Sequence, residues 1–230
     1  MTADIDVVIS YCNYPAYVAD AVRSALDQDG VNTRVIVVDD ASDDPLPALG
    51  DDPRIEVIRH PSRRGPGASH NTGLSACTAD YVSFLDADDL YPSDRSQLLL
   101  DLMVRTSADL TYGAQQFFND GDVPLLRLTP EQRRSVPSGP PGLIPGTVLV
   151  RTQAARRFGD MLQDRMVGAF LDWVVRARTG PHPPREQSIQ AATLLRRSHA
   201  TNITRVFAHE SSGLFEAIAK NRGTVRREQE

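Results

Sequence analysis

Three carboxylate side chains, Asp86, Asp88 and Asp89, directly follow the apolar run Tyr81–Leu85. A run of this length and composition, bounded by polar residues, is typical of a buried strand in a parallel sheet. Carboxylates this close together repel one another unless a positive charge lies among them, and a divalent cation commonly supplies it. The stretch therefore predicts a metal site beyond the end of a central strand. The alternative is a turn or a helix N-terminus, where Asp is also common.

Two more polar clusters follow predicted strands. Ser10–Asn13 comes after one apolar run, and Asp39–Asp40 comes after another. Ligands of open α/β sheets bind beyond the carboxyl ends of the strands, so we expect both clusters beside the metal site. The loop Arg63–Arg64–Gly65 adds guanidinium groups, which suit phosphate oxygens. Together these residues predict a pocket for a nucleotide diphosphate, in which the acidic pair hydrogen-bonds a base or a ribose.

Each cluster also has a purely structural interpretation. The segment Asp39–Asp44 could be an acidic turn that caps a helix, and Arg63 and Arg64 could belong to a solvated loop. The chain contains neither GxxxxGK[ST] nor GxGxxG. A P-loop enzyme and a dinucleotide oxidoreductase are therefore not supported.

Strands and helices alternate over the first hundred residues. The predicted strands are Ile5–Ser10, Arg34–Val38, Ile55–Arg59 and Tyr81–Leu85, and the predicted helices are Ala16–Gln28, Ala68–Ala76 and one that begins at Pro92. This alternation indicates βαβ units, and hence an α/β fold with a mostly parallel sheet flanked by helices.

The second half of the chain has a less regular pattern. We predict strands at Leu110–Gln116, Thr147–Arg151 and Thr193–Arg197, a turn at Asn119–Asp122, an irregular loop at Ser135–Gly146, helices at Gln153–Phe158, Phe170–Arg178 and His209–Asn221, and a disordered tail at Gly223–Glu230.

Bulk properties narrow the class of protein. A chain of 230 residues holds one good core, and a net charge of -5 argues against a nucleic-acid partner. Cys12 and Cys77 show neither metal-type spacing nor a disulfide framework. The first strand follows Met1 without a signal-peptide pattern, and no apolar run is long enough to span a membrane. We therefore expect a cytoplasmic protein.

The stretches Ile5–Gln28, Arg34–Asp44 and Gly65–Tyr91 resemble family 2 glycosyltransferases in order and spacing. The shared pattern is a strand with a following Asn, Val-Asp-Asp-x-Ser, an Asn-x-Gly helix and Asp-x-Asp-Asp. The resemblance implies a GT-A fold with a Rossmann-like sheet, a nucleotide-sugar donor, commonly a UDP-sugar, and Mn²⁺ or Mg²⁺. Cys12 departs from the aromatic residue usual before Asn, so stacking on the base would fall to Tyr11. His70 replaces the usual Arg.

The resemblance also implies roles for single residues. Asp40 would hydrogen-bond the base, Asp86 would face the ribose and the metal, and Asp88 would ligate the metal. The expected nucleotide-sugar-binding residues are Ser10, Tyr11, Asn13, Asp39, Asp40, Arg64, Asn71, Asp86 and Ala87.

The second half resembles the same family more faintly. Leu171–Asp172–Trp173, with Arg178 six residues after the Asp, is similar to the family's acidic catalytic motif, although its Glu is missing. Asp172 would be the general base that takes the proton of an acceptor hydroxyl. Arg196–Arg205 resembles a later family element, in which His199 would contact the metal or the diphosphate. The structural alternatives are a helix-start residue for Asp172 and a hydrogen-bonding role for His199.

The sequence thus predicts a metal-dependent, inverting glycosyltransferase of hexosyl type that moves one sugar from a donor to an unidentified acceptor. The alternatives are a nucleotide-sugar-binding protein without catalysis and a nucleotidyltransferase. We expect one catalytic domain over residues 1–222, with the donor bound by residues 1–110 and the acceptor by residues 111–222, chiefly Ala114–Gly146. We expect a disordered tail at residues 223–230. The chain could also form a homodimer.

Overall fold

The computed structural model describes residues 2–44, 46–122, 138–163 and 168–199. The helix expected at His209–Asn221, the tail at Gly223–Glu230 and the start of the loop at Ser135–Gly146 lie outside these residues. The strands are β1 (Asp4–Tyr11), β2 (Asn32–Asp39), β3 (Ile55–Arg59), β4 (Tyr81–Asp86), β5 (Leu110–Asn119), β6 (Val148–Arg151) and β7 (Glu186–Ser198). The helices are α1 (Val18–Leu26), α2 (Pro66–Ala76), α3 (Arg95–Thr106), α5 (Thr152–Arg157) and α6 (Ala169–Thr179), with a 3₁₀ turn, η1, at Pro145–Thr147.

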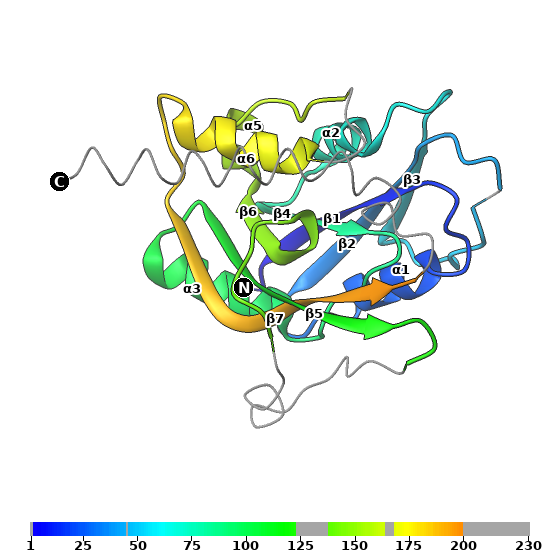
Figure 1. Cartoon of the computed structure of the whole chain (residues 1–230), viewed down its shortest axis with the longest axis horizontal. Helices are drawn as coiled ribbons and strands as arrows, with labels where there is room; N and C mark the ends of the chain where they lie inside the picture. Colours follow the sequence, from blue (N-terminus) through cyan, green and yellow to red (C-terminus); the bar gives the residue numbers. More distant parts are fainter. Residues whose placement is uncertain (1, 45, 123–137, 164–167, 200–230) are drawn as a thin grey trace.

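The described strands form one seven-stranded sheet in the order β3-β2-β1-β4-β6-β5-β7 (Figure 1). Strand β1 pairs in parallel with β2 and β4, β2 with β3, and β5 with β7. Strand β6 is antiparallel to both of its neighbours. The predicted α/β fold with a mostly parallel sheet is therefore confirmed.

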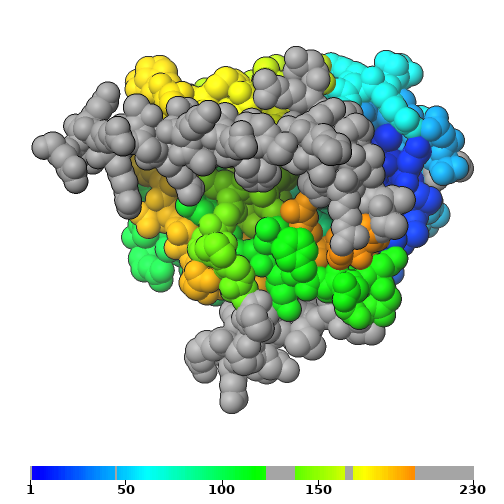
Figure 2. All heavy atoms as spheres, viewed as in Figure 1, coloured from blue at the N-terminus to red at the C-terminus, as the bar shows by residue number. Residues whose placement is uncertain are grey.

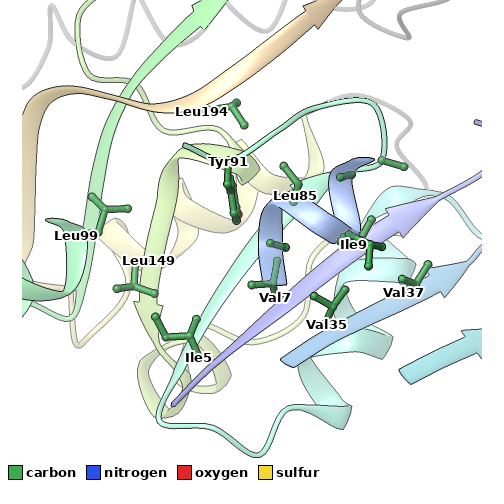
Figure 3. Packing of buried hydrophobic residues seen from close by; sticks show 14 of the residues in the cluster. Ile5, Val7, Ile9, Val35, Val37, Leu85, Tyr91, Leu99, Leu149 and Leu194 are labelled. Carbon is green, nitrogen blue, oxygen red and sulfur yellow. The ribbon is translucent and has the colours of Figure 1, made fainter. Parts of the chain in front are cut away.

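Helices cover both faces of the sheet, with α1 and α3 on one face and α2, α5 and α6 on the other (Figure 1). Side chains of a strand alternate between the two faces, so odd and even positions of β1 enter different cores. Ile5, Val7 and Ile9 pack under α1 and α3 with β2 and β4 residues (Figure 3), whereas Val8 packs under α2. The two-sided burial explains why these strands are continuous apolar runs.

Strand β7 is longer than the sequence indicated. We predicted Thr193–Arg197, but the strand runs over 13 residues from Glu186. It lies at the edge of the sheet, where β5 is its neighbour, and the pairing has register shifts on both sides of Ala114. Its polar first half is largely exposed, since an edge strand needs no apolar cover on its free side.

Helix α2 approaches the sheet closely through Gly73. A Cβ atom on Gly73 would lie 2.2 Å from Cγ1 of Val8, a fully buried residue of the central strand β1. The absence of a side chain therefore sets the distance between α2 and the sheet, and with it the place of the loop that precedes α2.

We expect Gly73→Ala to destabilise the protein by up to about 2 kcal/mol. Overpacking costs about 1–3 kcal/mol, and the higher helix propensity of Ala returns about 1 kcal/mol of it. Urea unfolding measures the loss. Gly139→Ala is the matched control, because no atom lies within 4 Å of the place that its new methyl group would take. Equal stability of the two variants would contradict the close packing of α2.

Candidate active site

The carboxyl ends of three parallel strands meet at one edge of the sheet. Ser10 at the end of β1 is in register with Val38 of β2 and with Asp86 of β4. The next residue, Tyr11, is in register with Asp39. The three polar clusters that the sequence placed after separate strands are thus neighbours in the structure.

Asp86, Asp88 and Asp89 form an acidic cluster in which one oxygen of each carboxylate lies within 4.8 Å of the others. Burial, and then the neighbouring Asp88, raise the pKa of Asp86 to about 6. Burial is also the first cause that raises the pKa of Asp89 well above its usual range. The cluster accordingly binds protons readily, as expected for carboxylates assembled to hold a cation.

His199 contacts this cluster through Asp88. Its Nε2 atom lies 2.8 Å from Oδ2 of Asp88, and the residue is 7% exposed. Carboxylate oxygens with one imidazole nitrogen suit Mn²⁺ and also accept Mg²⁺, which prefers oxygen. The residues present therefore fit a divalent cation, and the sequence-predicted metal residues Asp86, Asp88 and His199 are brought together.

Two tyrosines that the sequence analysis did not single out line the same place. The ring centroids of Tyr14 and Tyr17 lie 5.7 and 5.0 Å from that of His199. Burial, followed by the charges of Asp88 and Asp86, raises the pKa of Tyr14 to about 12. Both tyrosines lie within four residues after the Ser10–Asn13 cluster, and this closeness in sequence was the available signal.

Asp40 is 5% exposed and holds the basic loop in place. Its Oδ1 accepts hydrogen bonds from the backbone N–H of Arg64 at 2.9 Å and from Nδ1 of His60 at 2.7 Å, and its Oδ2 accepts one from the N–H of Gly65 at 2.7 Å. Nε2 of His60 lies 2.8 Å from Oγ1 of Thr72 on α2. A carboxylate accepts about four hydrogen bonds, so about one position on Asp40 is left for a ligand.

Asp39 and Asn13 tie two loops together. Asp39 accepts the N–H of Ser42 at 2.9 Å and pairs with the guanidinium group of Arg59. The Asn13 side chain donates to Asp43 at 3.0 Å and accepts the backbone N–H of Asp43 at 2.8 Å. Asn13 has a φ of 59°, a conformation that Asn tolerates better than most residues. Both side chains order the loops that follow β1 and β2 through these contacts.

Tyr11 does not fit the role expected of it. Its side chain is 0% exposed and packs in the core below α1 and α3. The period of two along β1 turns this residue to the same face as Ile9, so its ring has no free face for a base. Of the neighbouring candidates, Ser10 is half-buried and Ala87 is 2% exposed.

The loop before α2 is joined to the segment that precedes α6. Arg64 donates to Oε1 of Gln163 at 3.0 Å, and the Asn71 amide both donates to and accepts from the backbone of Met161 at 2.8 Å. A Cβ on Gly67 would lie 2.0 Å from the carbonyl oxygen of Leu162. Arg64, in the basic loop, and Asn71, on α2, therefore connect this part of the chain to the segment Met161–Gln163.

Asp172 lies in the first turn of α6, where its Oδ2 accepts a hydrogen bond from Nε of Arg176 at 2.7 Å. The next residue, Trp173, is fully buried and donates to the carbonyl of Gly159 at 2.6 Å. Arg178, which stands six residues after the Asp as in the family motif, pairs with Glu186. Arg176 is the guanidinium group that orients Asp172.

His70 is buried against the edge of the Phe84 ring, with a centroid separation of 5.1 Å. Burial lowers the pKa of His70 to about 4, so the side chain is neutral at pH 7. A residue in this state does not replace the charge of the Arg that is usual at its position.

A mostly parallel α/β sheet with acidic residues at the ends of β2 and β4 is the arrangement of the GT-A fold, which the solved structures of TarS share with this chain. Comparison with known proteins identifies the family: the chain belongs to glycosyl transferase family 2, whose model matches residues 6–159. Among the described residues, no helix has the length and apolar character needed to cross a membrane.

Relatives and solved structures agree with this membership. The chain is 37% identical over 101 residues to the succinoglycan biosynthesis protein ExoO of Rhizobium meliloti, covering 43% of this chain and 29% of ExoO. It is 28% identical over 181 residues to the putative teichuronic acid biosynthesis glycosyltransferase TuaG of Bacillus subtilis, covering 76% and 64%. A crystal structure of S. aureus TarS residues 1–349 with UDP-GlcNAc matches 88% of this chain and 60% of TarS, with 18% identity and a TM-score of 0.67. In these three matches the chain spans less than two thirds of its relative.

The raised pKa of Asp86 predicts pH-dependent metal binding and stability. A carboxyl group with a pKa of about 6 is about 9% ionised at pH 5 and about 91% at pH 7, so Mn²⁺ affinity should rise about tenfold between them. In the absence of metal, Asp86 keeps its proton to a higher pH in the folded state than in the unfolded chain. Stability in a chelator should therefore fall as pH rises from about 4 to about 6.

Calorimetric Mn²⁺ titrations and thermal melts in a chelator, each at pH 5 and pH 7, check both effects. In Asp86→Asn the fall in melting temperature between pH 5 and pH 7 should be smaller than in the unaltered chain, because an amide does not titrate. The same Mn²⁺ affinity at both pH values would contradict the assignment of Asp86 to the metal.

Proposed function

We propose that this chain is a metal-dependent, inverting glycosyltransferase that moves one sugar from a nucleotide-sugar donor, a UDP-sugar, to an acceptor nucleophile. The observation that carries the proposal is the acidic cluster of Asp86, Asp88 and Asp89 with His199, at the sheet edge where Asp39 also lies. TarS with UDP-GlcNAc has the same fold, which supports the choice of donor. The proposed unit is one catalytic domain over residues 1–222.

On the donor side, Asp40 would recognise the base. Three of its roughly four acceptor positions are occupied by His60, Arg64 and Gly65, so a ligand with a single N–H fits best. Uracil offers one N–H on its pairing edge, whereas guanine offers an N–H and an amino group together. The one acceptor position left on Asp40 therefore supports a uridine nucleotide.

Asp86, Asp88 and His199 would hold Mn²⁺ or Mg²⁺, which supplies the charge that stabilises the departing diphosphate. Arg64, in the loop before α2, would add a guanidinium group for the phosphates. Ser10, Asn13, Asp39 and Ala87 would shape the walls of the donor site, partly through the loop contacts described above.

Asp172 would be the general base. One carboxylate that removes the acceptor proton during attack on the anomeric carbon supports a single displacement, which inverts the configuration at that carbon. Arg176 fixes the carboxylate through its 2.7 Å hydrogen bond, and buried Trp173 fixes the helix turn. The acceptor would lie over residues 114–146, of which the structure describes 114–122 and 138–146.

Neutral His70 and the half-buried Cys12 keep one other function open: a nucleotide-sugar-binding protein without turnover. Release of free nucleotide diphosphate from UDP-sugars in the presence of Mn²⁺ tests the proposal against it. Binding of UDP-sugars without any release of UDP, with several acceptor classes supplied, would favour the binding protein.

Variants of Asp172 and Asp88 should separate base from metal. Asp172→Asn cannot accept a proton, so transfer should fall about 10²–10⁴-fold while UDP binding stays within about twofold. Asp88→Asn should weaken Mn²⁺-dependent UDP binding and slow transfer together, because the metal contacts the diphosphate before and during reaction. Steady-state rates and calorimetry on both variants measure this. A folded Asp172→Asn enzyme within a few-fold of the unaltered rate would remove Asp172 as the base.

Asp40→Ala should weaken UDP binding by about 1–3 kcal/mol, since the base loses a charged acceptor. The melting temperature should fall as well, because three donors lose their partner. Asp44→Ala is the matched control: this residue lies in the same acidic segment and is exposed, and it meets Asn13 through its backbone N–H, which the substitution keeps. Calorimetric UDP titrations well below the melting temperature compare the two. Equal affinities would exclude Asp40 from base recognition.

A further inference from the structure

The last strand of the described chain returns to the acidic cluster. Leu195 of β7 and Leu90 exchange both backbone hydrogen bonds at 2.9 Å, forming an antiparallel bridge outside the main sheet. Two residues further on, the N–H of Arg197 donates to Oδ1 of Asp89 at 2.9 Å. Another two residues on, His199 meets Asp88. Alternate residues from Leu195 to His199, at and just beyond the end of β7, therefore contact the segment from Asp88 to Leu90, as the period of two predicts.

The side chain of Arg197 adds a second set of contacts. Its Nε donates to the backbone carbonyl of Asp88 at 3.0 Å, and its Nη1 lies 3.3 Å from Oδ1 of Asp120. The guanidinium carbon lies 4.7 Å from the ring centroid of Tyr17 and 4.8 Å from that of Phe118. The side chain is only 8% exposed. A planar group held by two rings and by directed hydrogen bonds has little freedom to move.

These contacts join four parts of the chain. Tyr17 precedes α1, and its hydroxyl donates to Asp120 at 2.9 Å. Phe118 belongs to β5, Arg197 belongs to β7, and Asp88 follows β4. Orange atoms at the end of β7 lie among green atoms of the β5 region in Figure 2. Leu90, Phe118 and Leu195 form a small apolar cluster that supports the same junction.

We propose that Arg197 is a positioning residue that holds the segment Asp86–Asp89 in the geometry required for metal binding. The inference rests on the metal site of the proposed function. Three clustered carboxylates repel one another, so their segment would open unless it is held from outside. Arg197 holds it at two points: its backbone N–H binds the Asp89 carboxylate, and its guanidinium group binds the Asp88 carbonyl and is the part that the test removes. It acts on metal affinity through these residues and does not contact the metal.

The test is the Mn²⁺ affinity of Arg197→Met in the full-length chain, measured by electron paramagnetic resonance of free Mn²⁺ well below the melting temperature. Met keeps the apolar stem and removes the guanidinium group. Affinity should fall about 10–100-fold, the usual effect of losing a group that orients metal ligands. Arg197→Lys should recover only part of the loss, because an ammonium group does not reproduce the planar fork.

Arg151→Met is the matched control. Arg151 also donates Nε to a backbone carbonyl, that of Ala108 at 3.0 Å, and also lies over an aromatic ring, that of Tyr81 at 5.6 Å. Tyr81 begins β4, so this arginine sits at the opposite end of that strand from the cluster. The control should lower the melting temperature without changing Mn²⁺ affinity.

Mn²⁺ affinity within twofold of the unaltered chain in Arg197→Met would overturn the inference and leave the proposed metal site intact. If Arg197→Met does not fold, Arg197→Lys is measured instead, and an Mn²⁺ affinity within twofold of the unaltered chain again overturns the inference. Failure of the unaltered chain to bind Mn²⁺ would overturn the metal site itself, and the positioning role with it.

Discussion

Repulsion among carboxylates is the constraint on which the site depends. Asp86, Asp88 and Asp89 follow a strand that is buried on both faces, where water screens charge poorly. Such a group persists only where the surrounding chain fixes it. The supports come from distant segments: the backbone of β7 at Asp89, His199 at Asp88, and the tyrosines before α1. The second half of the chain is thus part of the acidic site that the first half begins.

The sequence predicted best what depends on local pattern. Apolar runs such as Tyr81–Leu85 became strands, and because parallel strands end at the same edge, the clusters at Asp39 and Asp86 came together as expected. Hydrophobic pattern also placed the helices to within a few residues. These are properties that a period of two or of 3.6 residues determines without knowledge of the rest of the chain.

Long-range contacts were not predictable in this way. His60 follows an edge strand and carries no signal that it will meet both Asp40 and Thr72. Arg197 looks like one of many surface arginines until β7 is placed beside β5. Tyr11 stands in a polar cluster, yet the alternation of β1 turns it into the core. In each case the partner lies on an element whose position only the assembled sheet decides.

The close approach at Gly67 and the paired amide of Asn71 affect how such a chain can be recombined. Both anchor the segment Met161–Gln163 to α2 at backbone atoms of Met161 and Leu162, so the match depends on the shape of that segment and on the identities of Gly67 and Asn71. A chimera that takes its second half from another family member would therefore need a junction after residue 163, or would need to bring its own α2. A cut at the midpoint of the sequence would separate α2 from the segment that packs against it.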